Sequence, residues 1–149
     1  MQSNFQIKFI TPAECIDLRS RILRPGQNIE FCHFPEDQLT TTFHLGLIID
    51  QKIVSTGTFM LNSNPQFSQA KHPYRLRGMA TEHSFQGKNL GSALLQRAEA
   101  ILKSQNCDFL WFNAREKAFS FYQKNNYIFY GEMFDIHLVG PHKVMYKWL

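Results

Sequence analysis

Cysteine is scarce in this sequence and never occurs in a pair. The 149 residues include three cysteines, Cys15, Cys32 and Cys107, which are far apart and form no C-x-x-C motif. Three such thiols cannot all be bridged within one chain, and no H-E-x-x-H or paired-Cys spacing is present to bind a metal ion. We therefore expect buried, reduced cysteines, no metal site and a reducing, cytoplasmic environment.

Long hydrophobic runs are also missing. The longest apolar stretches, such as residues 45–49, are short, whereas a transmembrane helix needs about 20 consecutive apolar residues. The N-terminus lacks a charged segment that leads into the apolar core of a signal peptide. These absences predict a soluble protein with no membrane partner.

Charge of one sign is not concentrated anywhere in the chain. The 16 Lys and Arg against 12 Asp and Glu give a formal net charge of +4, but the basic residues are scattered. Nucleic-acid-binding proteins gather such residues into a patch or run, so we expect no nucleic-acid partner. A basic nucleic-acid-binding protein stays open as a rival, for which binding would depend steeply on salt. The excess of positive charge also suits a phosphorylated cofactor.

The composition is that of a packed globular protein. Hydrophobic residues make up 44% of the chain, charged residues make up 19%, and 14 residues are Phe. The length fits one ordinary domain over residues 1–149, and we find no internal repeat and no low-complexity segment. A second independent core is not expected.

The first half of the chain predicts three strands and one helix. Residues 5–10 alternate apolar and polar side chains, as a half-buried strand does, and Thr11-Pro12 then marks the start of a helix that we expect to end at Leu23. The segment that follows, up to Thr42, is expected to be irregular. β-branched and aromatic residues over 43–50 and 52–60 predict an antiparallel hairpin around Asp50-Gln51.

The second half alternates strand-like and helix-like segments, which is typical of a β-α-β unit with parallel strands. After a polar surface loop over residues 62–73, we expect a strand over 74–81 and an amphipathic helix over 90–104. The apolar run 109–112 predicts a strand covered on both faces. A helix over 115–124 and a terminal hairpin, formed by 127–136 and 142–148 and joined through Gly140-Pro141, complete the pattern.

The connection between Thr81 and Leu90 is predicted to bind phosphate. A helix N-terminus exposes about four unpaired N–H groups and roughly half a positive charge. Gly87 and Gly91 let the backbone approach an anion closely, Lys88 adds a charge, and Ser92 adds a hydroxyl donor. These features suit a pyrophosphate, while a glycine-containing turn also serves simply to reverse the chain.

The same loop resembles the signature of the GNAT acetyltransferase superfamily. That signature is Arg or Gln, two residues, Gly, one residue, and Gly or Ala, and Gln86-Gly87-Lys88-Asn89-Leu90-Gly91 departs from it at Asn89. Asn is the non-glycine residue that most readily adopts a positive φ, and it can also cap a helix. The preceding Arg77-Gly78-Met79-Ala80-Thr81 resembles the family strand whose main chain pairs with the pantetheine arm of coenzyme A.

A second segment resembles the family's A-x-x-x-Y-x-x-x-G-F motif. It begins at Ala118, has Tyr122 at the position of the tyrosine, and carries Asn126-Tyr127 in place of Gly-Phe. Arg115 stands where a frequent Asn of the family is found. The resemblance is specific from about Tyr74 to Tyr127 and covers most of the chain in the order of its elements.

The resemblance implies a GNAT-like α/β fold. Such a fold has a mostly antiparallel, mixed and twisted sheet of six to seven strands, with a central parallel β-α-β unit and helices on both faces. The implied activity is N-acetyltransfer from acetyl-CoA to a primary amine of a small molecule or peptide, by direct attack in a ternary complex. No Cys or Ser is placed as a covalent relay.

The resemblance also implies the site residues. Tyr122 is expected to donate a proton or hydrogen bond to the departing thiolate. The expected contacts with coenzyme A come from two strands and the phosphate loop: Met79, Ala80, Thr81, Gln86, Gly87, Lys88, Asn89, Leu90, Gly91, Ser92 and Asn113.

Several roles are left open by the sequence. The general base has five chemically capable candidates, none fixed by a motif: Glu82, His83, Glu132, His137 and His142. The acceptor pocket is expected to draw on the first helix, the segment from Arg24 to Thr42 and the terminal hairpin, with Phe31, Phe34 and His44 as lining candidates. An exposed edge strand in that hairpin leaves a homodimer open.

Two alternative functions would use the same loop between Thr81 and Leu90. A non-catalytic acyl-CoA-binding sensor or regulatory domain would use the same residues without turnover. A dinucleotide-binding enzyme is the other, but the loop lacks a full G-x-G-x-x-G and a clear acidic residue some twenty positions later.

Overall fold

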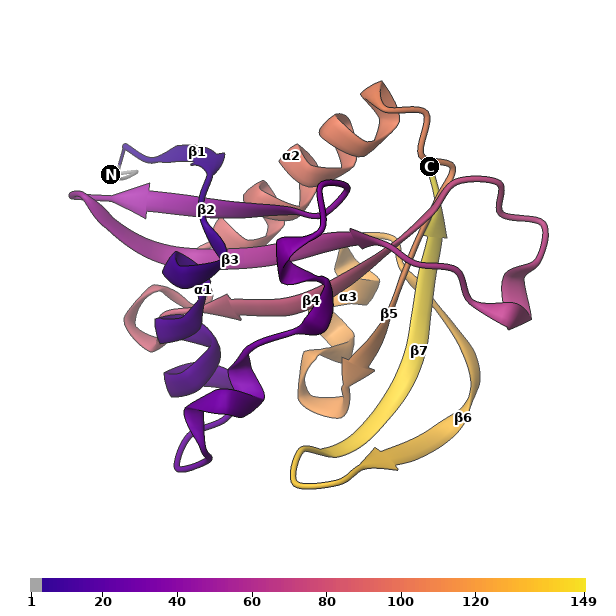
Figure 1. Ribbon diagram of the computed structural model, residues 1–149. Helices are drawn as coiled ribbons and strands as arrows, with labels where there is room; N and C mark the ends of the chain where they lie inside the picture. The colour runs from indigo at the N-terminus through magenta and orange to yellow at the C-terminus, as the bar shows by residue number, and fades with distance from the viewer. Residues whose placement is uncertain (1–3) are drawn as a thin grey trace.

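A seven-stranded mixed sheet organises the computed structural model, which describes residues 4–149 (Figure 1). Its strand order is β1-β2-β3-β4-β5-β7-β6. The strands are β1 (Gln6–Phe9), β2 (Phe43–Ile49), β3 (Lys52–Leu61), β4 (Pro73–Thr81), β5 (Phe109–Arg115), β6 (Ile128–Ile136) and β7 (Gly140–Trp148). Among the described strands, only β4 and β5 pair in parallel, across the connection that contains α2. The predicted mixed sheet and its parallel β-α-β unit are confirmed.

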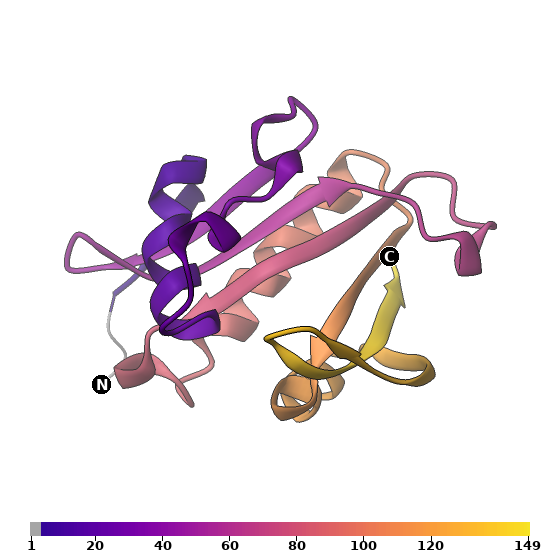
Figure 2. The same cartoon turned by 60° about the horizontal axis from the view of Figure 1, so that its bottom comes forward.

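The helices cover both faces of this sheet. They are α1 (Pro12–Leu18), α2 (Leu90–Ser104) and α3 (Phe119–Lys124). On β3, Thr56 donates a hydrogen bond to the Cys15 Sγ of α1 at 3.5 Å, whereas the adjacent Gly57 packs toward Leu94 of α2. Successive strand residues point to opposite faces, so α1 and α2 lie on opposite sides of the sheet, as Figure 2 also shows.

The buried stripe of α2 supplies much of the core. Leu94, Leu95, Ala98 and Leu102 are fully buried, and they pack with sheet residues such as Phe59. Full burial of a leucine side chain stabilises the fold by about 1.5–3 kcal/mol. The helix predicted over residues 90–104 is therefore confirmed, and its apolar face anchors it against the sheet. Its N-terminus is thereby fixed beside the end of β4.

The first helix starts as predicted but changes its winding. Thr11 and Glu14 form a reciprocal capping box, in which each residue's side chain accepts the other's backbone N–H. Regular α-helix ends at Leu18, and a π-helical turn follows over Arg19–Leu23. The expectation of one regular helix to Leu23 is corrected in this respect. The wider turn coincides with the buried Arg19 side chain, which bonds into the protein interior.

The two hairpins differ in how well the sequence predicts them. Asp50 and Gln51 both have positive φ, as a two-residue hairpin turn requires, so the β2–β3 turn is confirmed. The terminal hairpin turns at residues 137–139 instead, and Gly140 and Pro141 belong to β7. Pro141 is tolerated there because β7 begins to pair with β5 only at His142, so the missing N–H costs no bond of the inner ladder.

The boundary between β5 and α3 lies later than predicted. Strand β5 continues past Phe112 to Arg115, because its pairing with β7 extends to Arg115 and His142. A short 3-10 turn, Glu116–Ala118, then leads into α3. The helix expected over residues 115–124 therefore begins at Phe119, and Arg115 lies on the strand.

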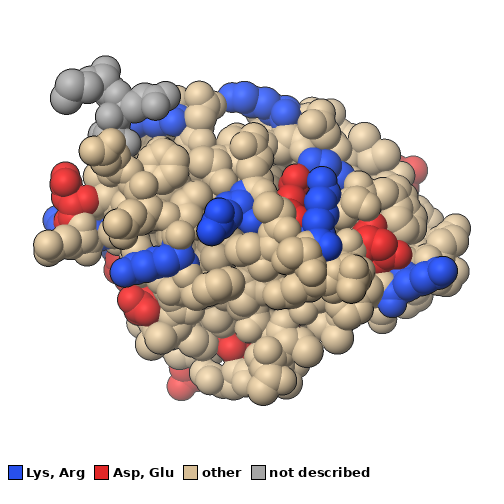
Figure 3. All heavy atoms as spheres, turned by 90° about the horizontal axis from the view of Figure 1, so that it is seen from above, with Lys and Arg blue, Asp and Glu red and all other residues tan. Residues whose placement is uncertain are grey.

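The described surface carries both charges in dispersed form. On the face drawn in Figure 3, acidic side chains lie among the basic ones, and the basic side chains form no continuous stripe. No helix within residues 4–149 is long and apolar enough to cross a membrane. In the same part of the chain, no group of three or more His, Cys, Asp or Glu is arranged to hold a metal ion. All three cysteines are free and buried, as predicted.

Candidate active site

A cavity of about 550 Å³ lies where β4, β5, α2 and α3 meet. It exists because β4 and β5 pair only from Pro73 to Arg75, opposite Phe109 to Trp111. Beyond these pairs the two strands diverge, and the side of β4 that faces β5 has no strand partner from Leu76 onward. Main-chain donors and acceptors on this open edge are available to an extended ligand.

A β-bulge marks the middle of the open edge. Thr58 pairs with Arg77 and Thr56 pairs with Ala80, so two β4 residues, Gly78 and Met79, oppose Gly57 alone. Gly78 has φ of +65°, and a Cβ at this position would lie 2.8 Å from the Arg19 Nε. Glycine is thus required both by the backbone conformation and by the close approach of Arg19.

The N-terminus of α2 forms one end of the cavity. The first bond of the helix runs from the Ala93 N–H to the Asn89 carbonyl oxygen at 3.1 Å, which leaves the N–H groups of residues 90–92 without intrahelical acceptors. Asn89 has φ of +63°, so it retains the left-handed conformation expected of a glycine at this position. Its side chain makes no capping bond and instead accepts a hydrogen bond from the Lys124 Nζ at 2.8 Å.

All the residues predicted to contact coenzyme A line this cavity except Lys88. Those brought together are Met79, Ala80, Thr81, Gln86, Gly87, Asn89, Leu90, Gly91, Ser92 and Asn113. The Lys88 ammonium lies 5.4 Å from the centre of the Phe85 ring and does not line the cavity. The Gln86 side chain donates a hydrogen bond to the Thr81 carbonyl oxygen at 2.9 Å, so it ties the loop to the end of β4.

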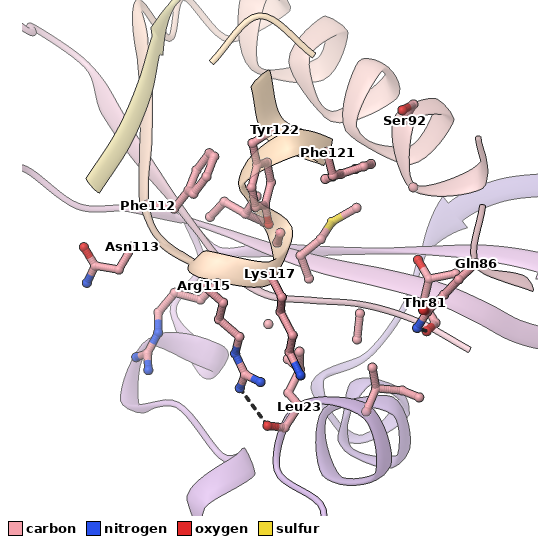
Figure 4. A pocket seen from close by; sticks show the side chains of 18 of the residues that line it. Leu23, Thr81, Gln86, Ser92, Phe112, Asn113, Arg115, Lys117, Phe121 and Tyr122 are labelled. Carbon is pink, nitrogen blue, oxygen red and sulfur yellow. Dashed lines mark hydrogen bonds between the residues drawn. The ribbon is translucent and has the colours of Figure 1, made fainter. Parts of the chain in front are cut away.

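Tyr122 lines the cavity. Its ring packs 4.2 Å from the centre of Phe112, and Figure 4 shows its hydroxyl directed into the cavity. No residue among 4–149 forms a hydrogen bond with this hydroxyl. Burial raises the pKa of Tyr122, against a smaller opposite effect of Arg115. The phenol is therefore protonated at neutral pH and able to donate a hydrogen bond to a ligand.

The contact between α2 and α3 depends on Gly91. A Cβ at this position would lie 3.1 Å from the Phe121 ring, which is closer than ordinary packing allows. Gly91 therefore sets the spacing between the helix that carries the free N–H groups and the helix that carries Tyr122.

The cavity passes from one face of the sheet to the other. Leu76 packs in the core beneath α2, so the neighbouring Arg75 and Arg77 point to the opposite face. On β5, Phe112 packs on Tyr122, so Asn113 and Arg115 likewise point away from α3. Figure 4 shows the Asn113 side chain pointing away from Tyr122.

Only two candidate bases lie in the cavity wall, His83 and His142. Glu82 is held by Arg21, whose Nη2 lies 2.6 Å from its Oε2. Glu132 and His137 are exposed and do not line the cavity. Three of the five candidates are thus placed outside the site.

His142 is the better placed of the two histidines. It is 3% exposed, and its Nδ1 lies 2.7 Å from the Gly140 carbonyl oxygen. Burial lowers its pKa, so the ring is neutral at pH 7. A neutral ring must donate from Nδ1 to that carbonyl oxygen, which leaves Nε2 as an acceptor. His83, by contrast, is exposed.

Of the three residues predicted to line the acceptor pocket, Phe31, Phe34 and His44, the structure places only Phe34 in the cavity wall. Phe34 lines the cavity, whereas Phe31 is exposed and lies outside it. His44 is not a pocket residue: its Nδ1 lies 2.7 Å from the Thr58 Oγ1, and its Nε2 lies 3.1 Å from the Asp37 carbonyl oxygen. The prediction for His44 is wrong because its β2 position points toward a buried polar cluster.

That polar cluster, formed by Arg19, Asp37, His44 and Thr58, is a feature that the sequence did not reveal. Arg19 is 1% exposed and forms a bidentate pair with Asp37 at 2.8 and 3.0 Å. It also donates to the Thr58 Oγ1 and to the Cys32 carbonyl oxygen. The cluster holds residues 32–37 against β3 and the bulge of β4.

The basic residues of the cavity wall were also missed. Lys117 and Lys124 line the cavity, together with four arginines: Arg24, Arg75, Arg77 and Arg115. No Asp or Glu lines this described cavity. One signal was available, because the alternation Arg75-Leu76-Arg77 in a central strand places two cations on one face. The other basic residues come together only through the fold.

Known proteins are similar to this chain in sequence and in fold. Residues 14–127 match the family described as "Acetyltransferase (GNAT) family". The uncharacterised N-acetyltransferase YitI of Bacillus subtilis (strain 168) is 39% identical over 144 residues, which cover 97% of this chain and 96% of that protein.

Solved structures agree in fold at low sequence identity. A Lactobacillus plantarum protein assigned as an N-acetyltransferase has a TM-score of 0.80 at 18% identity, with 99% of each chain covered. FeeM, an N-acyl amino acid synthase from uncultured soil microbes, has a TM-score of 0.76 at 12% identity, with 99% of this chain and 92% of that chain covered. For Escherichia coli ElaA the TM-score is 0.75 at 14% identity, with 97% and 99% covered.

Proposed function

Because this chain belongs to the GNAT acetyltransferase family, we propose that it transfers the acetyl group of acetyl-CoA to a primary amine of a small molecule or peptide. The amine attacks directly in a ternary complex. The observation that carries this proposal is the continuous cavity from the free N–H groups of α2 to the Tyr122 hydroxyl and on through the gap between β4 and β5. Two substrates can meet there from opposite faces of the sheet.

The binding end fits a diphosphate. The N–H groups of Leu90, Gly91 and Ser92 lack intrahelical acceptors, and the positive end of the helix dipole lies beside them. Gly87 has φ of +76°, and a Cβ there would meet nothing within 4 Å, so the loop is open on this side. The pantetheine arm would then pair with the open edge of β4 near Met79 and Ala80.

Tyr122 acts as a hydrogen-bond donor to the sulfur. Acetyl-CoA supplies an activated thioester, and the thiolate that departs needs its charge stabilised. An ordinary tyrosine is about 1.5 pKa units less acidic than a thiol, which makes full proton transfer uphill by about 2 kcal/mol. Burial raises the Tyr122 pKa and widens this difference. Hydrogen-bond stabilisation therefore describes its role better than proton donation.

The acceptor amine must lose a proton before it attacks. At pH 7 this costs about 4.6 kcal/mol for a lysine-like amine and about 1.4 kcal/mol for an α-amino group. His142 is the proton acceptor we propose, directly or through one water, because its Nε2 is free and it lines the cavity on the face opposite α3.

The test combines calorimetry with a thiol-release assay. We expect the folded protein to bind coenzyme A and to release thiol from acetyl-CoA when a suitable amine is supplied from a panel of amines, polyamines, amino acids and peptide N-termini. Binding without turnover on any amine would favour a sensor instead. If well-folded protein bound no coenzyme A, the proposed function would be overturned.

A further inference from the structure

The acceptor side of the cavity carries a cluster of four arginines, Arg24, Arg75, Arg77 and Arg115. Resting on the proposed function, we propose that the acceptor amine also carries an oxyanion, a carboxylate or a phosphate, which Arg24, Arg77 and Arg115 bind. The oxyanion fixes the amine at the gap between β4 and β5. The same chemistry is found in amino acids and in phosphorylated amines, and the experiment below separates these two sources.

The arginines are on the side of the sheet opposite the diphosphate end. Arg75 and Arg77 alternate with Leu76, which is buried under α2, and Arg115 alternates with Ala114, which belongs to the same core. Arg24 follows the π-helical turn and reaches the cavity from the α1 side. The phosphate-binding N–H groups belong to α2, on the other face. Binding of coenzyme A therefore leaves these arginines for the second substrate.

Few protein groups satisfy this arginine cluster. The Arg115 Nη2 donates one hydrogen bond, to the Leu23 carbonyl oxygen at 2.7 Å, which Figure 4 marks below Tyr122. The Arg77 Nη1 has a distant acidic neighbour, the Glu36 Oε1 at 3.9 Å. Within residues 4–149, no other side-chain hydrogen bond or ion pair involves the four guanidinium groups.

Arg19, an arginine with a structural role, differs from the arginine cluster in how its donors are used. In the buried Arg19, both terminal nitrogens of the guanidinium are bonded within the protein, to Asp37, Thr58 and the Cys32 carbonyl oxygen, and only Nε lacks a partner. A guanidinium has five N–H donors in a planar fork that matches a carboxylate or phosphate. Arg19 uses most of its donors in hydrogen bonds that stabilise the fold, whereas most donors of the arginine cluster remain available to a ligand.

Aromatic contacts hold two of the arginines in place. The Arg77 guanidinium lies 3.9 Å from the centre of the Phe34 ring, and the Arg75 guanidinium lies 4.8 Å from the Trp111 ring. Stacking on a ring leaves the edge donors of the fork free. Arg77 is thereby positioned before a ligand arrives, which lowers the entropy lost on binding, and Arg75 adds a fixed positive charge near it.

The cluster is also electrostatically frustrated without an anion. Burial and the neighbouring Arg75 lower the pKa of Arg77 to about 10, against a smaller opposite effect of Glu36. Burial and the charge of Arg24 lower the pKa of Arg115 in the same way. Arg24 and Arg115 also lower the pKa of His142 and so help to keep it neutral. An oxyanion would relieve this repulsion and would bring its amine beside the His142 side chain.

The experiment measures kcat/KM for matched pairs of amines in the thiol-release assay. The pairs are an amino acid against its carboxamide, and O-phosphoethanolamine against ethanolamine. We expect the amine with the oxyanion to be preferred by about ten- to a hundredfold, the effect of one or two hydrogen bonds to a charged group. Preference within the first pair alone identifies a carboxylate, and preference within the second pair alone identifies a phosphate.

Two variants and a control locate the effect. Arg24→Gln and Arg77→Gln should raise the KM of the preferred amine about tenfold or more, with little change in the KM of acetyl-CoA. Arg97→Gln, on the exposed face of α2, should change neither. Calorimetry of the preferred amine with protein saturated by coenzyme A gives the same comparison without turnover.

The outcomes are distinguishable from failure of the proposed function. If neutral amines were acetylated as well as their charged partners, or if Arg24→Gln and Arg77→Gln behaved like Arg97→Gln, the oxyanion proposal would be overturned while acetyltransfer stood. If coenzyme A did not bind at all, both proposals would be overturned.

Discussion

At the scale of single residues, the Tyr122 hydroxyl is free because its ring, and not its oxygen, is used for packing. The ring contacts Phe112 and Phe121, and the oxygen faces the cavity. Packing and chemistry are therefore separable in this residue. Removing the oxygen leaves the contacts of the ring in place.

Tyr122→Phe should lower kcat by about 10²- to 10³-fold, the usual effect of losing one donor to a developing anion. The dissociation constant of coenzyme A should change little, since the aromatic packing is retained. Tyr146→Phe, on β7 and outside the cavity, is the matched control. Unchanged turnover in Tyr122→Phe would remove this residue from the mechanism.

Arg19 and Arg21 lie two positions apart, and replacing each by Met should have very different effects. Arg19→Met leaves Asp37 buried and unpaired, so the free energy of unfolding should fall by about 3–5 kcal/mol. Arg21→Met removes two surface ion pairs, with Asp17 and Glu82, and should cost no more than about 1 kcal/mol for each pair. Urea denaturation measures both. Equal losses would show that the Arg19 cluster is not a stabilising feature.

At the scale of elements, the spacing between α2 and α3 is set by one missing side chain. Gly91→Val should push Phe121 away, displace the start of α2 and weaken coenzyme A binding by about tenfold or more, which is about 1.4 kcal/mol. Ala100→Val introduces the same residue on the exposed side of the helix and should leave the affinity unchanged. Calorimetry compares the two, and equal affinities would argue against this role of Gly91.

The sequence predicted those elements whose cause is local. The helix start at Thr11-Pro12, the hairpin around Asp50-Gln51 and the amphipathic helix over residues 90–104 each depend on neighbours in the chain, and all were confirmed. Of the two departures from the family motif at residues 118–127, the one at Asn126 has a local explanation, whereas the one at Tyr127 involves a distant contact. Asn126 has a positive φ like the glycine it replaces, and Tyr127 donates a hydrogen bond to the Glu99 Oε2 at 2.6 Å.

The elements that were predicted wrongly depend on distant partners. The extension of β5 to Arg115 requires β7, and the placement of Pro141 in a strand requires a ladder that starts one residue later. The buried pair of Arg19 and Asp37 and the arginine cluster join residues that are far apart in the chain. Alternation within one strand indicates only that Arg75 and Arg77 share a face, and the other contacts arise only through the fold.

At the scale of the whole molecule, two buried histidines link stability to pH. Burial lowers the pKa of both His44 and His142 in the folded protein, while unfolded histidine titrates near pH 6.5. The unfolded chain therefore binds more protons as the pH falls below about 6.5, and folding stability should decrease between about pH 7 and 5.

Denaturation in urea at a series of pH values measures this effect. Each histidine can contribute a slope of up to about 1.4 kcal/mol per pH unit. His142→Gln should reduce the slope, whereas His137→Gln, at an exposed position, should not. A stability independent of pH over this interval would contradict the neutral state assigned to His142.

The separation of β4 from β5 has a mechanical consequence. The sheet has two parts, β1 to β4 on one side and β5, β7 and β6 on the other. Strand pairing joins these parts at one end only, from Pro73 to Arg75 of β4. The sheet is therefore closed where β4 and β5 begin and open where they end. A ligand that pairs with the free edge of β4, as we propose for the pantetheine arm, would add main-chain hydrogen bonds where the protein has none and would restrain the two parts of the sheet relative to each other.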